Sequence, residues 1–155
     1  MNLVELLQKK NLTLSVAESC TGGLISSLIT DIPDSSKVFV FGAVTYSLSM
    51  KEKLLSVSHT HLVKNGPYNY ETVIEMAKNI KKYSKTDVSI AVSGVAGPSD
   101  EIDTKAGVCY VAVDFCGKIY TKIIDTKTNK RKTNKEKFAR KSIEFLIEII
   151  ENHCD

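Results

Sequence analysis

Apolar and polar positions alternate along the chain with two periodicities, one typical of strands and one typical of helices. Residues 12–16 are apolar at every second position, which predicts a half-buried strand. Residues 24–29 repeat apolar side chains four positions apart, which predicts a helix directly afterwards. Because the two patterns go on alternating to the end of the chain, we expect a central sheet between helical layers.

Further strands are expected where apolar residues run almost without interruption. Residues 38–46 predict a strand that is buried on both faces. Residues 87–92 and 108–113 predict two more strands, and the Cys-Gly pair at 116–117 predicts a hairpin turn into a last strand over 119–124. Since a hairpin joins antiparallel strands, the sheet should be mixed. The expected fold is α/β, a three-layer α/β/α sandwich with a mixed central sheet.

Helices are expected over 3–10, 47–55 and 71–83, the last because its apolar positions form one face. Residues 58–69 are expected to be irregular, since glycine and proline interrupt them. Capping boxes are predicted at two helix starts, Asn2 with Glu5 and Thr133 with Glu136. The expected buried face of the final helix consists of Ala139, Ile143, Leu146, Ile147 and Ile150.

The composition is that of one soluble globular domain over residues 1–155, with 43% hydrophobic and 25% charged residues. No apolar run approaches the roughly 20 residues that a membrane span needs, and the amino terminus lacks the pattern of a signal peptide. The four cysteines include no C-x-x-C pair, which indicates free thiols rather than a disulfide framework or a zinc site. We therefore expect a cytoplasmic protein.

The net charge of +3 is small, but basic residues are concentrated near the carboxyl end. Residues 118–141 contain ten Lys or Arg against two acidic residues. Such a run is typical of a solvated face, and its other use would be contact with a phosphate-bearing ligand. No aromatic residue interrupts the core of the run to stack bases, so the pattern does not favour a nucleic-acid partner.

The first candidate site is the segment Ala-Glu-Ser-Cys-Thr-Gly-Gly at 17–23, between the first strand and its helix. Ser19, Cys20 and Thr21 are three potential nucleophiles directly before Gly22 and Gly23. A strand-to-helix turn of this kind directs backbone N–H groups toward an anion or a developing oxyanion. Ordinary helix caps have a similar composition, so the segment alone leaves both interpretations open.

A hydroxyl nucleophile also needs a base, and the candidates lie at the ends of other strands. Tyr46 and Lys51 follow the second strand, and a second glycine turn occupies 93–98. No histidine lies at a glycine-bounded strand end, and His59 and His61 lack the further ligands of a metal site, so they are expected to be loop residues. A lysine can act as the base only if its environment lowers its pKa, whereas most lysines are solvated.

Together, the segment 17–23, the Gly-Ala-Val-Thr-Tyr-Ser stretch at 42–47 with Lys51, and the Ser-Gly-Val-Ala-Gly-Pro turn at 93–98 resemble a known family. This is the nicotinamide-nucleotide amidase family, also called the carboxyl-terminal domain of the competence-damage protein CinA. The resemblance covers about residues 1–150. It implies the same three-layer fold and self-association, with no metal or organic cofactor.

The resemblance also implies an activity, the hydrolysis of nicotinamide mononucleotide to nicotinic acid mononucleotide and ammonia. It assigns the nucleophile to Ser19 and the base to Lys51, with Tyr46 supporting the site. Around them we expect Thr21 as an accessory hydroxyl and the N–H groups of Thr21, Gly22 and Gly23 as oxyanion donors. The turn containing Gly94, Ala96 and Gly97, together with Lys135, is expected to hold the substrate phosphate; Ser93 is either part of the site or an ordinary strand-end hydroxyl.

Three segments depart from the family pattern. Where relatives carry a Gly-Ala-Val-Ser-Glu-like stretch, residues 66–70 read Gly-Pro-Tyr-Asn-Tyr, and residues 99–103 place three acidic side chains in a loop that is usually glycine-rich. A Gly-Asp-Arg segment is replaced by Thr-Asn-Lys at 133–135. These changes leave Ser19 and Lys51 in place and affect the segments expected to hold the substrate. Two other interpretations therefore stay open: an amidase for another small amide, or a binding module in competence or DNA-damage responses. The chain is expected to be a stand-alone version, without the amino-terminal domain of some relatives.

Overall fold

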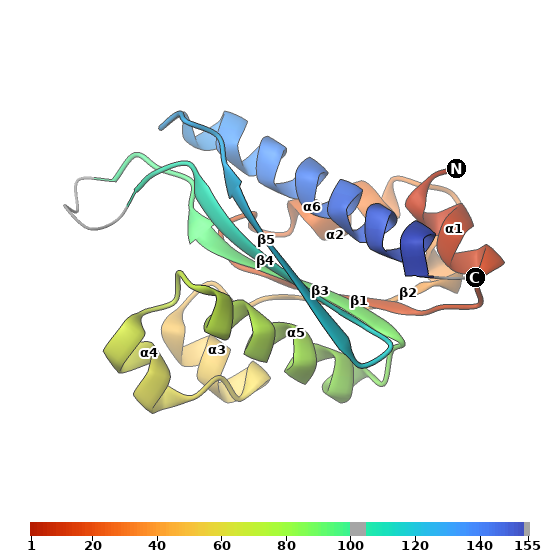
Figure 1. The fold of residues 1–155 in the computed structure, drawn as a ribbon, viewed down its shortest axis with the longest axis horizontal. Coiled ribbons are helices and arrows are strands. Elements are labelled where there is room, and N and C mark those ends of the chain that lie inside the picture. The colour runs from red at the N-terminus through yellow and green to blue at the C-terminus, as the bar shows by residue number, and fades with distance from the viewer. Residues whose placement is uncertain (100–104, 154–155) are drawn as a thin grey trace.

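The computed structural model of the chain describes residues 1–99 and 105–153, which form a three-layer α/β/α sandwich (Figure 1). Apart from Ser99, the acidic loop 99–103 lies outside the described residues. The five strands are ordered β2-β1-β3-β4-β5; β1 is parallel to both β2 and β3, and β4 and β5 are antiparallel additions. The predicted fold class and the mixed sheet are therefore confirmed. The strands are β1 Leu14–Glu18, β2 Phe39–Val44, β3 Val88–Val95, β4 Val108–Phe115 and β5 Lys118–Asp125.

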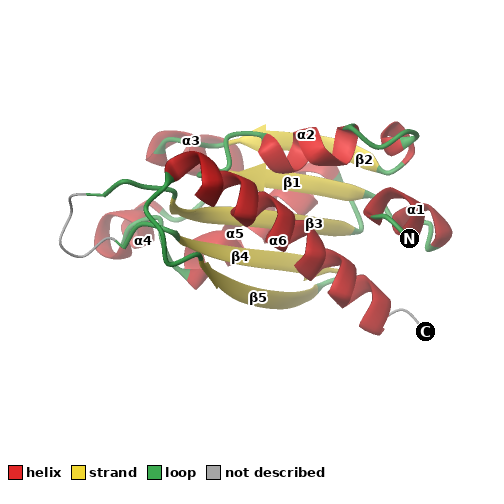
Figure 2. Cartoon of the chain, turned by 90° about the horizontal axis from the view of Figure 1, so that it is seen from above, coloured by secondary structure: helices red, strands yellow, loops and turns green. Residues whose placement is uncertain are grey.

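Helices cover both faces of the sheet (Figures 1 and 2). One face carries α1 Leu3–Lys9, α2 Leu24–Thr30 and α6 Arg131–His153; the other carries α3 Leu48–Leu55, α4 His59–Asn65 and α5 Tyr70–Ser84. A short 3₁₀ turn, η1 Ser35–Lys37, leads into β2. Apolar side chains of the sheet form a separate core with each helical layer. None of the described helices is both long and apolar enough to cross a membrane.

The burial of two strands differs from the sequence prediction. β1 was expected to be half-buried, yet all five of its residues are buried because strands flank it on both sides and helices cover both faces. β2 was expected to be buried on both faces, but it forms the edge of the sheet, where Val40 and Val44 are 55% and 50% exposed. An apolar run does not reveal how many neighbours a strand has.

Two helix predictions were also wrong. Residues 58–69 are not irregular throughout, because α4 occupies His59–Asn65 and stops at Gly66. The final helix starts at Arg131, so Thr133 lies inside its first turn and cannot be the cap of the predicted box. The box formed by Asn2 and Glu5 at α1 is confirmed. The buried residues of α6 are Asn134, Phe138, Ala139, Ser142, Leu146, Ile149 and Ile150, while Ile143 and Ile147 pack partly buried against the core.

Candidate active site

A serine and a lysine meet at the carboxyl ends of β1 and β2. Ser19 is the first residue after β1, and Lys51 lies in α3, whose start is capped by the Ser47 hydroxyl. The Lys51 Nζ lies 3.0 Å from the Ser19 Oγ and donates to it. Both side chains are buried, at 5% exposed surface for Ser19 and 1% for Lys51. The contact therefore joins a potential nucleophile to a desolvated amine.

The surroundings of Lys51 lower the affinity of its amine for a proton. Its Nζ also donates to the carbonyl oxygens of Thr45 at 2.7 Å and Tyr46 at 3.3 Å. Burial lowers the pKa of Lys51 from 10.5 to about 8, although the nearby Cys20 sulfur opposes this by favouring the charge. A neutral amine can spend its two N–H bonds on the two carbonyls, which leaves its lone pair directed at the Ser19 hydroxyl. Lys51 thus has the arrangement of a base.

Of the three potential nucleophiles in the first turn, only Ser19 contacts a candidate base within the described part of the chain. The Cys20 thiol is buried in the core, with its sulfur 3.7 Å from that of Cys109. The Thr21 hydroxyl is also buried and donates to the carboxylate of Glu18 at 2.6 Å. The geometry therefore favours Ser19 over its two neighbours.

Two further hydroxyls flank Ser19. The strand register pairs Glu18 with Val44 and, on the other side, Ala17 with Ala91; continued beyond the strands, it brings Thr45 and Ser93 beside Ser19. The hydroxyls of Thr45 and Ser93 are fully buried and have no hydrogen-bond partner among residues 1–99 and 105–153. Buried polar atoms normally have partners, so these two unpaired hydroxyls beside Ser19 are unusual.

The turn after β1 is filled by the protein's own carboxylate. Glu18 Oε2 accepts from the backbone N–H groups of Gly23 at 3.1 Å and Ile25 at 3.0 Å, and the N–H of Gly22 donates to the Ser19 carbonyl. The expected oxyanion donors Gly22 and Gly23 are thus already engaged. The Thr21 N–H makes no hydrogen bond to any residue that the structure describes, so it is the donor of the expected three that remains available.

In the turn after β3, backbone carbonyls accept hydrogen bonds from side chains, whereas in the first turn backbone N–H groups donate to one. The Ala96 carbonyl accepts from Asn134 Nδ2 at 2.8 Å, and the Gly97 carbonyl accepts from the Arg131 guanidinium at 3.0 Å. Gly94 was expected in this turn but lies in β3 itself, and it has a packing reason to be glycine, because a Cβ there would lie only 2.3 Å from the Val108 carbonyl oxygen. This turn therefore holds side chains of α6 in place.

Tyr46 connects the two turns through its two polar groups. Its carbonyl oxygen accepts from Lys51, while its exposed hydroxyl lies 2.8 Å from Nη2 of Arg131 and accepts from it. Because the guanidinium also binds the Gly97 carbonyl, it is oriented from two sides. Tyr46 thus supports both the base and a cation of α6.

A cavity of about 620 Å³ lies between the first turn and α6. Three cations and one acidic side chain line it, and a Cβ at Gly22 would meet the Lys135 Nζ at 3.3 Å, so this ammonium lies directly against the turn. A concave wall of that charge suits an anionic group. The lining residues are Thr21, Gly22, Gly23, Leu24, Ser27, Arg131, Lys132, Lys135 and Glu136.

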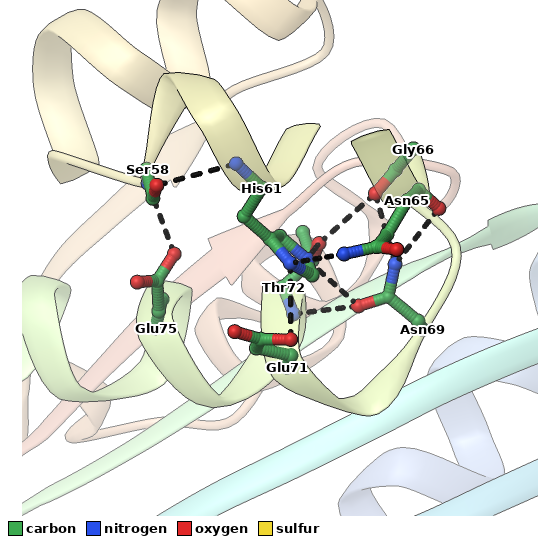
Figure 3. A network of polar contacts seen from close by, with 8 residues as sticks. All are labelled: Ser58, His61, Asn65, Gly66, Asn69, Glu71, Thr72 and Glu75. Carbon is green, nitrogen blue, oxygen red and sulfur yellow. Dashed lines mark hydrogen bonds and ion pairs between the residues drawn. The ribbon is translucent and has the colours of Figure 1, made fainter. Parts of the chain in front are cut away.

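A polar network organises the segment 66–70, where the chain departs from the family pattern (Figure 3). Asn69 caps α5 by accepting from the Thr72 N–H, and its amide nitrogen donates to the Gly66 carbonyl at 2.9 Å. His61 was expected in a loop but lies in α4 and is only 7% exposed. Its Nε2 contacts both Asn69 and Thr72. The network thus holds one wall of a second cavity, of about 630 Å³, lined by Asn65, Gly66, Pro67, Tyr68, Val95, Lys105, Val108, Tyr110, Ile123 and Asp125.

Residues 1–99 and 105–153 contain no group of three or more His, Cys, Asp or Glu side chains that could hold a metal ion. The His61 ring instead uses both nitrogens on neighbouring side chains, with Nδ1 next to Asn65 and Glu71.

Comparison with protein families gives a match over residues 1–150 to the model described as "CinA C-terminal domain". The chain belongs to this family. Among curated relatives, the CinA-like protein of Pseudothermotoga lettingae is 44% identical over 112 residues, which are 72% of this chain and 28% of that protein. The CinA-like protein of Thermotoga neapolitana is 37% identical over 144 residues, or 93% of this chain and 35% of that protein. The chain thus spans about a third of the length of these relatives.

Solved CinA structures share the fold of the whole chain. The competence damage-inducible protein A (ComA) of Klebsiella pneumoniae is 30% identical, with a TM-score of 0.91 and full coverage of both chains. A competence-damaged protein (CinA) superfamily protein of Escherichia coli is 31% identical, with a TM-score of 0.91, and the match covers 95% of this chain and 86% of that one.

Within this CinA domain, sequence reasoning missed two residues that shape the site. Glu18 was regarded only as part of the first motif, and Arg131 only as part of a basic run. The strand pattern offered a signal for Glu18, since an acidic residue ended a strand whose other positions are apolar or small. For Arg131 no local signal existed, because its partners Tyr46 and Gly97 are 85 and 34 positions away along the chain.

Proposed function

We propose that the chain is an amidohydrolase that converts nicotinamide mononucleotide to nicotinic acid mononucleotide and ammonia. The observation that carries the proposal is the buried contact of 3.0 Å between Lys51 Nζ and Ser19 Oγ. A serine without a histidine needs another base, and an amine whose pKa lies near 8 has a far larger neutral fraction at physiological pH than an ordinary lysine.

The reaction would proceed through an acyl-enzyme. Neutral Lys51 takes the Ser19 proton while the Ser19 Oγ attacks the carboxamide carbon, and the resulting oxyanion is stabilised by the free N–H of Thr21. The ammonium form of Lys51 then returns the proton to the departing ammonia. In the second half, Lys51 takes a proton from a water molecule that attacks the ester carbon. Lys51 returns this proton to the Ser19 Oγ as the ester bond breaks, and the acid product leaves as its carboxylate.

The neighbouring hydroxyls supply the polar contacts that a carboxamide requires. Thr45 and Ser93 are buried without partners next to Ser19, so they gain hydrogen bonds when an amide enters and lose none of their own. Their position favours a substrate whose reacting group has both a donor and an acceptor. A carboxamide has both.

The cation-lined cavity would receive the substrate phosphate. Arg131 is oriented by Tyr46 and Gly97, and Lys135 lies against Gly22, so both charges are held near the nucleophile turn. A guanidinium can contact phosphate with two donors, whereas Lys135 supplies a point charge. In this proposal Arg131 provides the planar contact that Lys135 cannot make.

The test is ammonia release from nicotinamide mononucleotide by the purified protein, with Ser19→Ala as the control. We expect steady release by the wild-type chain and none above background by the variant, whose fold is checked by circular dichroism. Equal release by both proteins would contradict the assignment of Ser19. Release from other carboxamides alone would point to a different substrate, and DNA binding without any release would favour a binding module.

A further inference from the structure

Glu18 is a carboxylate with no exposed surface that is surrounded by hydrogen-bond donors. Oε2 accepts from the Thr21 hydroxyl at 2.6 Å and from the N–H groups of Gly23 and Ile25 at 3.1 and 3.0 Å. Oε1 accepts from the N–H and the hydroxyl of Ser26 at 2.8 and 2.7 Å. Five donors from residues 21–26 therefore converge on one side chain.

The position of Glu18 in the chain makes this arrangement relevant to Ser19. Successive side chains at a strand end point to opposite faces of the sheet. Glu18 reaches toward α2, as its bonds to Ile25 and Ser26 show, while Ser19 meets Lys51 on the α3 face. One residue thus ties the backbone to the helix on one side, and the next presents the nucleophile on the other.

We propose that Glu18 is the positioning residue of the nucleophile turn: its carboxylate holds Thr21, Gly23 and the start of α2, and so sets the place of Ser19 against Lys51. The inference rests on the role of Ser19 in the proposed function, but not on the identity of the substrate. Glu18 lies behind the turn and touches no reacting atom.

The donor set suits a side chain that accepts with both of its terminal atoms. All five groups donate, and a carboxylate accepts with both oxygens and donates with neither. A glutamine of the same shape would place its NH₂ group against the donors on one side, so at least one backbone N–H would lose its acceptor. The turn would then be released from α2 although the side-chain volume is unchanged.

The experiment measures the reactivity of Ser19 without the natural substrate, using a fluorophosphonate probe. In the labelling step the Ser19 Oγ forms a bond to phosphorus, the P–F bond breaks, fluoride leaves, and Lys51 takes the hydroxyl proton. The labelled peptide and its rate of formation are followed by mass spectrometry. Because a displacement of about 1 Å costs roughly 100-fold in rate, Glu18→Gln should be labelled about 100-fold more slowly than the wild-type protein.

The matched control is Asp114→Asn, the same change from carboxylate to amide at a second buried site. Asp114 is 6% exposed, pairs with Lys81 at 2.6 Å and lies in β4 next to Ser89, near the other end of the sheet. A merely structural effect of losing a buried carboxylate should appear in both variants. We expect Asp114→Asn to lower the melting temperature and leave the labelling rate within twofold of wild type.

Labelling of folded Glu18→Gln at the wild-type rate would overturn the inference. If Glu18→Gln does not fold, Ser26→Ala replaces it, because it removes one hydroxyl donor from a partly buried helix position; slower labelling of about fivefold supports the inference, and an unchanged rate overturns it. Absence of wild-type labelling at Ser19 would overturn both proposals. Labelling of Ser19 without ammonia release from nicotinamide mononucleotide would overturn the proposed substrate alone.

Discussion

The turns at the ends of β1 and β3 both contain glycine, yet their backbone groups are hydrogen-bonded in opposite ways. In the turn after β1, backbone N–H groups point to an internal carboxylate, that of Glu18. In the turn after β3, backbone carbonyls of Ala96 and Gly97 accept from Asn134 and Arg131 of α6. The first turn thus holds the proposed nucleophile Ser19, and the second holds the cation Arg131.

The difference shows that a glycine turn at a strand end is not by itself an anion site. What such a turn can bind depends on which of its N–H groups have no hydrogen bond within the protein. At the first turn the Thr21 N–H remains, and at the second turn the guanidinium of Arg131 extends the site. We therefore expect substitutions around the first turn to change the rate of the chemical step, and substitutions around the second turn to change phosphate binding.

The largest effect on activity is expected from removing the proposed general base, Lys51. Lys51→Met keeps the length of the side chain but removes the amine, so hydrolysis should fall about 10³-fold or more. The readout is kcat for ammonia release. Lys53→Met, on the exposed side of the same helix, should be close to wild type; a comparable loss in both variants would contradict a specific role for Lys51.

The end of β3, directly before the second turn, should show the largest change in stability. Gly94→Ala forces a methyl group against the Val108 carbonyl oxygen, so the free energy of unfolding should fall by about 3 kcal/mol. Urea denaturation measures the change. Gly117→Ala, where a Cβ meets nothing within 4 Å and only the positive φ is strained, should cost about 1 kcal/mol. Equal losses would show that the close approach at Gly94 is relaxed in solution.

Arg131→Ala should separate binding from chemistry. Loss of one charged contact to the phosphate should raise KM for nicotinamide mononucleotide about 10- to 100-fold and leave kcat within a few-fold. Lys130→Ala, which removes a neighbouring charge that does not line the cavity, is the matched control. A fall in kcat with unchanged KM would instead assign Arg131 to the chemistry of the first turn.

The pH dependence follows from Lys51, whose pKa is lowered by burial to about 8. Only the neutral amine accepts the Ser19 proton, so kcat/KM should rise about tenfold per pH unit below pH 8 and level off above it. Since the folded-state pKa lies below the unfolded value of 10.5, the folded protein binds this proton more weakly, and stability should increase between pH 8 and 10.5 by about 3 kcal/mol. Lys51→Met should lack this increment; a profile that is flat from pH 6 to 9 would contradict a lysine base.

The smallest effect on stability is expected at Thr45. Its hydroxyl is buried without a partner, so Thr45→Val, which keeps the shape, should change the free energy of unfolding by less than about 1 kcal/mol. A clear loss of activity in this stable variant would place the hydroxyl at the substrate. A large loss of stability would mean that the hydroxyl has a partner in solution, which would remove it from the proposed site.

The sequence by itself determined the alternation of strands and helices, the mixed sheet and the position of Ser19 at a strand-to-helix turn. These features depend on residues that are close along the chain, such as the apolar periodicities and the Asn2–Glu5 capping box. The family resemblance added Lys51 as the partner of Ser19. Neither source placed β2 at the sheet edge, because strand order depends on contacts far apart in sequence.

Only the tertiary structure decided which polar groups are occupied and which are free. Burial lowers the pKa of Lys51. The N–H groups of Gly22 and Gly23 donate to the Ser19 carbonyl and the Glu18 carboxylate, so they are not available to a ligand. Arg131 binds the hydroxyl of Tyr46, which lies 85 positions earlier in the chain. Each of these depends on three-dimensional neighbours that no local pattern records. Hydrogen bonds within the fold therefore decide how much of the turn at Ser19 is left for a ligand.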